Sequence, residues 1–178
     1  VATRGPGGGK AQVLIDGKPA DQVSAFRMTY LQPAKSNFQE RRSPARDQSP
    51  HGVGLGTNIV PQKWTIRLLD DKGNFELSGS VTGKDGRENA FEPFVSASGQ
   101  IIIRPDEWRR AERNRKGDGW TWEVIRTTVG EVDFAGEKTE RFRVTLAMLL
   151  PNDKHQVELK FTGKIPPLEF DLFRPPLD

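Results

Sequence analysis

The chain has no cysteine and only two histidines among its 178 residues. The lack of cysteine excludes a disulfide framework, a thiolate metal site and a cysteine nucleophile, and it leaves the compartment open. No apolar run approaches the length of about 18 residues that a membrane-spanning helix needs, so such a helix is excluded. The chain opens at Val1 without a Met, which indicates a processed or excised piece. We favour an extracytoplasmic location and an exported bacterial parent protein.

Sequence motifs for catalysis and phosphate binding are also lacking. His51 and His155 lie more than 100 residues apart, and neither has a second histidine at metal-ligand spacing. No Gly-x-Ser-x-Gly sequence is present to carry a serine nucleophile. The glycine-rich run at 52–56 is followed by no helical pattern, so it lacks the helix terminus that would bind a phosphate. We predict no catalytic residue, two surface histidines, and a flexible hinge at 52–56.

The excess of charge of one sign is small. The formal net charge is +3 at pH 7, which does not require a nucleic-acid partner. Residues 104–116 hold six basic and three acidic residues, so this one segment accounts for the whole excess. The distribution of charge along the chain is therefore more informative than its total.

Glycine and proline, by contrast, are abundant, with 18 and 13 residues. Together with 34% hydrophobic and 29% charged residues, this composition is typical of a soluble globular domain with many turns. The length fits one domain. We predict a flexible tail at 1–10 and a single domain at 11–178 that includes a long loop at 33–58. Prolines predict an extended C-terminal arm at 164–178, anchored by Leu168, Phe170, Leu172 and Phe173.

Apolar and polar residues alternate with a period of two in several segments. This is the pattern of strands with one dry and one wet face, and turn-forming residues separate the segments. The predicted strands cover residues 12–15, 25–31, 64–68, 75–81, 101–103, 120–124, 132–134, 142–148 and 157–161. We predict an all-β fold, an antiparallel β-sandwich of jelly-roll or immunoglobulin-like type, with a closed barrel as the alternative.

One short helix is predicted at about residues 105–116. Pro105 suits the first helical position, Asp106 and Glu107 lie in the first turn, and Gly117 follows the last turn. Trp108 would then face the sheet. This helix would cover part of the sheet and expose its basic residues.

Trp120 and Trp122 lie two residues apart on a predicted strand, so both rings project from the same face. An exposed pair would form a platform on which sugar rings stack, with Glu123 and Arg126 as hydrogen-bonding neighbours. The alternative is that this face belongs to the core, because Val124 shares it and tryptophans bury large apolar areas. Both interpretations remain open from the sequence.

The basic residues of the predicted helix offer a second kind of site, for anions or nucleic acid. Spacings of four residues predict ion pairs of Asp106 with Arg110 and of Glu112 with Lys116, which would partly neutralise the segment. Four basic residues within 35–46 would enlarge the site if the two regions meet. The residues of this alternative site are Arg109, Arg110, Arg113, Arg115 and Lys116.

Acidic residues provide two further candidates. Glu131 and Asp133 alternate on one predicted strand, as the paired carboxylates of some glycosidases do, but we interpret them as a solvated strand edge. Carboxylates in predicted turns could bind Ca²⁺, although they are also ordinary turn residues. We predict no cofactor and no metal site, with Ca²⁺ as the alternative. The turn segments concerned are Asp70-Asp71, Asp85 and Asn152-Asp153.

Taken together, these patterns favour a non-catalytic accessory or binding module with extracellular polysaccharide as its ligand. One alternative is a protein-interaction or structural assembly domain that uses the C-terminal arm or an edge strand. A further alternative is binding of an anion or nucleic acid through residues 109–116. The sequence contains no motif that identifies a family.

Overall fold

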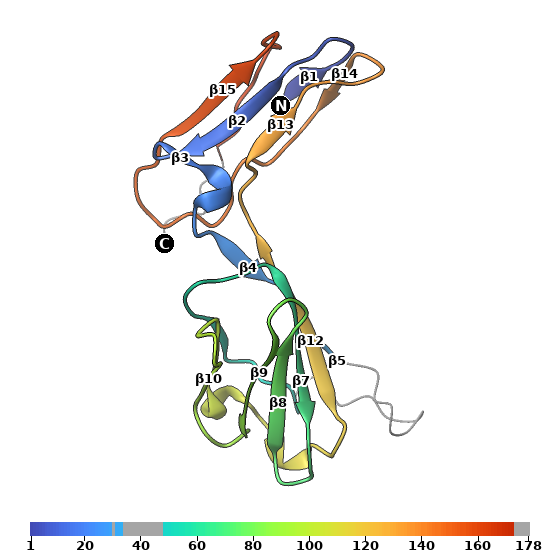
Figure 1. The fold of residues 1–178 in the computed structure, drawn as a ribbon, viewed down its shortest axis with the longest axis vertical. Helices are drawn as coiled ribbons and strands as arrows, with labels where there is room; N and C mark the ends of the chain where they lie inside the picture. Colours follow the sequence, from blue (N-terminus) through green and yellow to red (C-terminus); the bar gives the residue numbers. More distant parts are fainter. Residues whose placement is uncertain (30, 34–47, 173–178) are drawn as a thin grey trace. The chain divides into compact units, whose positions relative to one another are not determined.

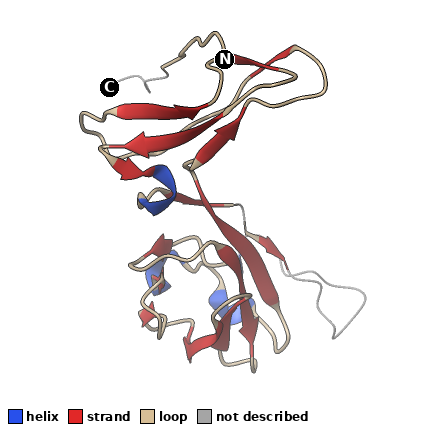
Figure 2. Ribbon diagram, turned by 45° about the horizontal axis from the view of Figure 1, so that its top comes forward, coloured by secondary structure: helices blue, strands red, loops and turns tan. Residues whose placement is uncertain are grey.

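The computed structural model describes residues 1–29, 31–33 and 48–172 and shows an all-β chain, as predicted (Figure 1). Its strands pair antiparallel, and its only helical elements among these residues are short 3-10 turns (Figure 2). The chain forms two compact units: unit 1 comprises Val1–Ala25 and Arg126–Asp178, and unit 2 is Phe26–Ile125. Unit 2 is thus an insertion in the chain of unit 1. That residues 11–178 form a single domain stays a prediction.

The larger sheet of unit 2 contains the predicted hairpin of β7 (Gln62–Leu68) and β8 (Asn74–Gly79). Asp70 closes its turn by accepting hydrogen bonds from the backbone nitrogens of Lys72 and Asn74 and from the Asn74 amide. The bond from the Asn74 side chain is the main cause that lowers the pKa of Asp70. The sheet order is β4 (Phe26–Met28), β12 (Gly119–Arg126), β7, β8 and β9 (Gly83–Asn89), with β5 (Gln32–Pro33) beside β12.

A three-stranded sheet completes unit 2, with the order β10 (Phe94–Val95), β11 (Ile101–Ile103) and β6 (Val53–Leu55). Strand β6 lies inside the segment predicted as a loop and hinge. The glycines of this segment are not a sign of a hinge: at Gly56, for example, a Cβ would overlap the carbonyl oxygen of Gly99. Its missing side chain permits close approach of two chain segments rather than flexibility. Residues 34–47 of the predicted loop lie outside the described residues.

Both sheets of unit 2 contribute to one aromatic core. The ring of Trp108 lies 5.4 Å from that of Phe75 and 5.9 Å from that of Trp120, and Phe94 meets Phe75 at 5.2 Å. Such aromatic pairs add roughly 0.5–1.5 kcal/mol each to the free energy of burial. The buried members of this core are Trp64, Ile66, Leu68, Phe75, Leu77, Ala90, Phe94, Ile101, Ile103, Trp108, Ala111, Trp120, Trp122 and Val124.

The prediction of a helix at 105–116 is wrong. Two 3-10 turns, Pro105–Glu107 and Ala111–Arg113, form there instead. Between them Arg110 takes a left-handed backbone conformation with φ 54°, which no α-helix tolerates. The capping signals at the two ends were therefore outweighed by contacts in the middle of the segment.

Those contacts involve three buried residues of the segment, Trp108, Ala111 and Asn114. The Trp108 indole and the Asn114 amide both donate hydrogen bonds to the carbonyl oxygen of Gln48, at 2.6 and 3.2 Å. Trp108 directly follows the first 3-10 turn, Ala111 begins the second and Asn114 follows it, so the three buried side chains come from two separate turns rather than from one helix face. Tertiary burial thus overrode local helix propensity.

Unit 1 contains the other two sheets. In the first, β2 (Lys10–Ile15) is central, between β13 (Glu131–Asp133) and β15 (Val157–Thr162), and β3 (Lys18–Pro19) also pairs with β2. In the second, β1 (Ala2–Arg4) pairs with β14 (Glu140–Phe142). The core between them centres on Phe134, whose ring lies 5.8 Å from that of Phe142 and 5.6 Å from that of Phe161.

Residues 1–10, predicted as a flexible tail, are instead part of unit 1. They contain β1 and the first residue of β2, and the Ala2 side chain is buried in the core. A Cβ at Gly8 would overlap the Phe134 carbonyl, and one at Gly9 would overlap the Thr162 carbonyl. Gly8 and Gly9 are therefore required by the close approach of neighbouring chain segments, whereas Gly7 takes a left-handed backbone with φ 74°.

The confirmed part of the fold prediction is the all-β class with antiparallel sheets. Each unit places residues from its two sheets in a common core. The finer prediction, a sandwich with jelly-roll or immunoglobulin-like topology, stays a prediction.

Candidate interaction site

The two tryptophans proposed as a sugar platform belong to the core of unit 2. Trp120 and Trp122 lie on β12 with 0% and 2% of their surfaces exposed. Trp64, opposite Trp122 on β7, and Trp108 are buried as well. Both tryptophans are therefore core residues, and neither ring is exposed for a sugar to stack on.

The polar neighbours of the proposed platform do not gather around it. Glu123 alternates with the two rings and so lies on the opposite face of β12, where its backbone nitrogen donates to the Thr29 hydroxyl at 2.8 Å. The Arg126 guanidinium donates to the Val23 carbonyl at 2.6 Å. Polysaccharide binding stays a prediction, but these four residues do not form one surface for it.

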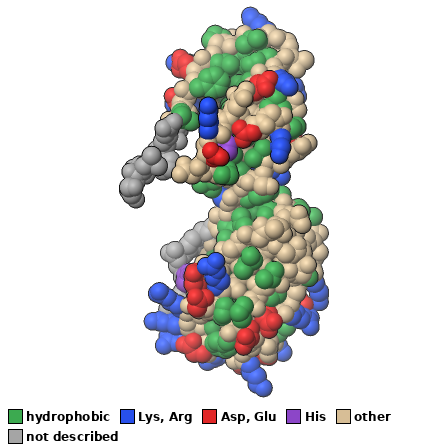
Figure 3. Space-filling model, turned by 90° about the vertical axis from the view of Figure 1, so that its left-hand side faces the viewer, with side chains coloured by type: hydrophobic (Ala, Val, Ile, Leu, Met, Phe, Trp, Pro, Cys, Tyr) green, Lys and Arg blue, Asp and Glu red, His purple; other side chains and the backbone are tan. Residues whose placement is uncertain are grey.

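The basic segment 104–116 has the exposure that anion binding requires. All five residues of the alternative site are exposed, and so are the acidic residues between them. Glu112 lies 3.9 Å from the Arg113 guanidinium, and the face drawn in Figure 3 shows basic and acidic side chains interspersed. Anion binding by Arg109, Arg110, Arg113, Arg115 and Lys116 stays a prediction, and the basic residues within 35–46 lie outside the described residues.

The acidic candidates are engaged in local bonds. Glu131 accepts a hydrogen bond from Lys10 at 2.7 Å, which raises the pKa of Lys10, and Asp133 accepts one from the Ala135 backbone at 2.8 Å. Asp85 accepts from the backbone and hydroxyl of Ser98. In the part of the chain that the structure describes, no group of three or more metal-ligating side chains gathers.

A different site lies at the second sheet of unit 1, where the C-terminal segment 165–172, called the arm below, pairs with β1. Val1 and Glu169 exchange two backbone hydrogen bonds of 2.6 and 2.8 Å, and Ala2 forms an antiparallel bridge with Leu168. Ala2 also pairs with Phe142 of β14, so the arm lies on the other edge of β1. Leu168 packs against the core of unit 1.

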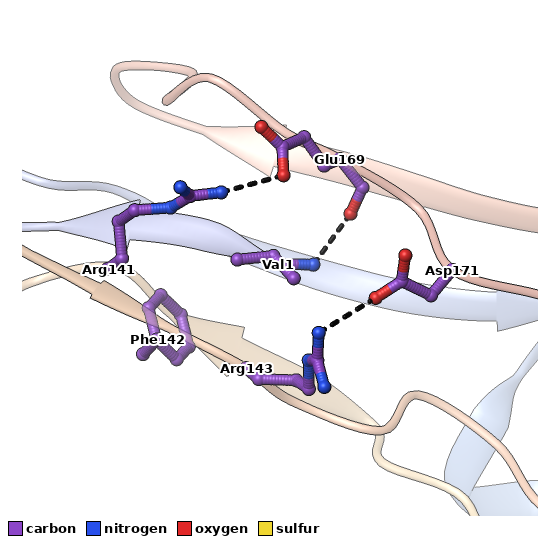
Figure 4. A pocket seen from close by; sticks show the side chains of 6 residues that line it. All are labelled: Val1, Arg141, Phe142, Arg143, Glu169 and Asp171. Carbon is purple, nitrogen blue, oxygen red and sulfur yellow. Dashed lines mark hydrogen bonds and ion pairs between the residues drawn. The ribbon is translucent and has the colours of Figure 1, made fainter.

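Two ion pairs tie the arm to Arg141 of β14 and to Arg143, which follows β14 (Figure 4). Arg141 meets Glu169 at 2.7 Å, and Arg143 meets Asp171 at 3.2 Å. These four residues, with Val1 and Phe142, line an open hollow. All four charged side chains are largely exposed, so each pair contributes only about 0–1 kcal/mol and is weakened by salt.

The apolar side chains of the arm are mostly uncovered. Leu168 is partly buried, but Phe170 and Leu172 are 69% and 81% exposed, and Ile165 is exposed as well. The prediction that Phe170 and Leu172 anchor the arm is therefore wrong, and Phe173 lies outside the described residues. The arm is held by one apolar side chain, a short backbone pairing and two exposed ion pairs.

The four charged residues of this site were not among the site residues predicted from the sequence. A signal was present, because Arg141 and Arg143 share the two-residue spacing of Glu169 and Asp171. Residues two apart on a strand lie on one face, so the two sets could have been matched by charge. What the sequence did not reveal is that β1 lies between them.

Comparisons with protein-family models, with curated proteins and with solved structures give no match to this chain. Within the described residues, no helix is long and apolar enough to cross a membrane.

Proposed function

We propose that the chain is a protein-interaction module that self-associates through the arm at 165–172. The observation that carries this proposal is the exposure of Phe170 and Leu172 on an extended segment in which, among the described residues, Leu168 is the side chain packed against the core of unit 1. Large apolar side chains on an extended chain are the usual anchors of strand-type recognition, in which the backbone supplies affinity and alternate side chains supply specificity.

This proposal has better support than polysaccharide binding. A sugar site of the predicted kind needs exposed aromatic faces, and all four tryptophans are buried in unit 2. The arm, in contrast, combines exposed apolar side chains with charged ones at alternate positions. A non-catalytic role is part of the proposal.

The experiment is sedimentation equilibrium from micromolar to about millimolar protein, a range that covers weak association. The wild-type mass should rise with concentration, and the double variant Phe170→Ser, Leu172→Ser should weaken association about tenfold or more, because it removes the apolar area buried at the interface. The matched control is Val81→Ser, Val95→Ser, which alters equally exposed residues of unit 2, 68% and 62%.

The control should associate like the wild type. A wild-type chain that stays strictly monomeric at about millimolar concentration would overturn the proposal. Equal weakening by both double variants would also overturn it, because the effect would then be one of general surface apolarity rather than of the arm.

A further inference from the structure

We infer that the partner of the arm is a second copy of this chain, and that two copies exchange arms reciprocally, so that Glu169 and Asp171 of each copy pair with Arg141 and Arg143 of the other. This inference rests on the proposed function and specifies how the copies assemble. The site on each copy would be completed by residues of the other.

The first support is charge complementarity. The acidic residues of the arm match Arg141 and Arg143 in number and spacing, and they pair with them at 2.7 and 3.2 Å (Figure 4). The receiving edge of β1 also offers matched backbone groups to the arm, since Val1 and Glu169 exchange two hydrogen bonds. An arm from another copy has the same sequence, so it fits the same edge with the same contacts.

The second support is the weakness of closure within the chain. Release of the arm breaks one backbone bridge, two terminal hydrogen bonds and two exposed ion pairs, and it withdraws only Leu168 from the core. Exposed ion pairs add little to stability and weaken with salt. The closed arm is therefore held with a small free energy, which is a condition for exchange.

The third support is the connection between β15 and the arm. Pro166 and Pro167 precede Leu168, and consecutive prolines keep the chain extended even when the arm is released. A released arm that is already extended loses less conformational freedom on docking to another copy. The same stiffness limits how readily the arm folds back.

Reciprocal exchange gives a closed dimer, because each copy both donates an arm and receives one. The contacts of the closed monomer are kept at each site, and the exposed Phe170 and Leu172 of each arm come to lie against the other copy, so concentration decides between the two forms. Closure within one chain has an effective concentration of roughly millimolar for a short linker, so the wild type should be mainly monomeric well below that concentration.

The test uses two charge-reversed variants of the full chain. The first carries Arg141→Glu and Arg143→Glu, and the second carries Glu169→Arg and Asp171→Arg. Within each variant the arm faces side chains of its own sign. In a reciprocal dimer of one copy of each, the unaltered acidic arm meets the unaltered arginines, and the reversed arm meets the reversed β14, so both sites are complementary.

At low salt an equimolar mixture should form a 1:1 dimer with an association constant about tenfold or more above that of either variant alone, measured by sedimentation equilibrium. Added salt should weaken this dimer. Combining all four substitutions in one chain restores complementarity and should return wild-type behaviour, which also controls for folding, with far-UV circular dichroism recorded for every variant.

A mixture that associates no better than its separate components would overturn arm exchange. If the wild type still associates through Phe170 and Leu172 in that case, the proposed function stands and only the exchange is wrong. If complementation occurs while the wild type and its Phe170, Leu172 double variant associate equally, the exchange stands and the role of the exposed apolar residues is wrong.

Discussion

His155 and Asp16 illustrate how a turn in unit 1 depends on two titratable side chains. The His155 ring contacts Asp16 at 2.7 Å through Nδ1 and the Pro151 carbonyl at 2.9 Å through Nε2. Asp16 occupies the left-handed region with φ 53° in the tight turn between β2 and β3 and also accepts a bond from the Gln156 backbone. The predicted surface histidine is thus a structural one, fixed by an acid that is 139 residues away.

The pKa values of this pair predict a pH window of stability. The hydrogen bond with Asp16, then that with Pro151, raises the pKa of His155, and the bonds from His155 and Gln156 lower the pKa of Asp16. The His155 contribution is complete below its ordinary pKa of about 6.5 and is lost as pH rises through its folded-state pKa. The Asp16 contribution is complete above about 3.9 and is lost as pH falls through its folded-state pKa.

The variant Asp16→Asn should lower the pKa of His155 toward its ordinary value, while asparagine still tolerates the left-handed backbone. An NMR titration of the His155 ring, assigned with His155→Gln, measures this shift. A titration midpoint that does not move in Asp16→Asn would show that the carboxylate is not the cause.

At the scale of elements, period-two apolar residues predicted several strands with a dry face. Of the strand predicted at 142–148, however, only Phe142 lies in a strand, β14, and the polar strand β9 was not predicted. Gly83–Asn89 contains no apolar side chain, yet it pairs with β8 along its length. Arg87 and Lys84 pair with Glu76 of β8 at 2.7 and 3.3 Å, and the Arg87 bond is the main cause that lowers the pKa of Glu76. Edge strands with charged side chains carry no apolar signal, because they contribute little to a core.

Gly8 and Gly9, predicted from composition to lie in a flexible tail, are instead found where two chain segments approach closely. The variant Gly8→Ala should reduce the free energy of unfolding by about 1–3 kcal/mol, because its Cβ would collide with the backbone of Phe134 and the two strands would have to separate. The control is Gly136→Ala in the same unit, whose Cβ would meet only ordinary contacts and should change stability by less than about 0.5 kcal/mol. Urea unfolding followed by far-UV circular dichroism measures both. Equal stability of the two variants would contradict the close-approach explanation.

At the scale of the whole molecule, the two units differ in the size of their cores. The buried core of unit 2 contains all four tryptophans, whereas the fully buried residues of unit 1 are mostly small or aliphatic, with Phe134 as the largest. Less apolar area removed from water means less stabilisation. We expect unit 1 to unfold at a lower urea concentration than unit 2.

Tryptophan fluorescence reports unit 2 alone, since no tryptophan lies in unit 1. Far-UV circular dichroism reports both units, so the two probes should give non-coincident urea transitions. Gly8→Ala should shift the circular dichroism transition and leave the fluorescence midpoint unchanged. Coincident transitions that move together in this variant would instead support the single domain at 11–178 that the sequence predicts.

The sequence by itself determined the all-β class and the strands of the β7–β8 hairpin, because alternation of apolar and polar side chains is a local property that directly reflects a sheet with one dry face. Only the tertiary structure decided the rest. Trp120 and Trp122 are core residues because a second sheet packs over them. Residues 105–116 form two 3-10 turns rather than a helix because this arrangement buries Trp108. The arm meets Arg141 and Arg143 because β1, from the other end of the chain, lies between them. Contacts between residues so distant in sequence depend on topology, which no local pattern encodes.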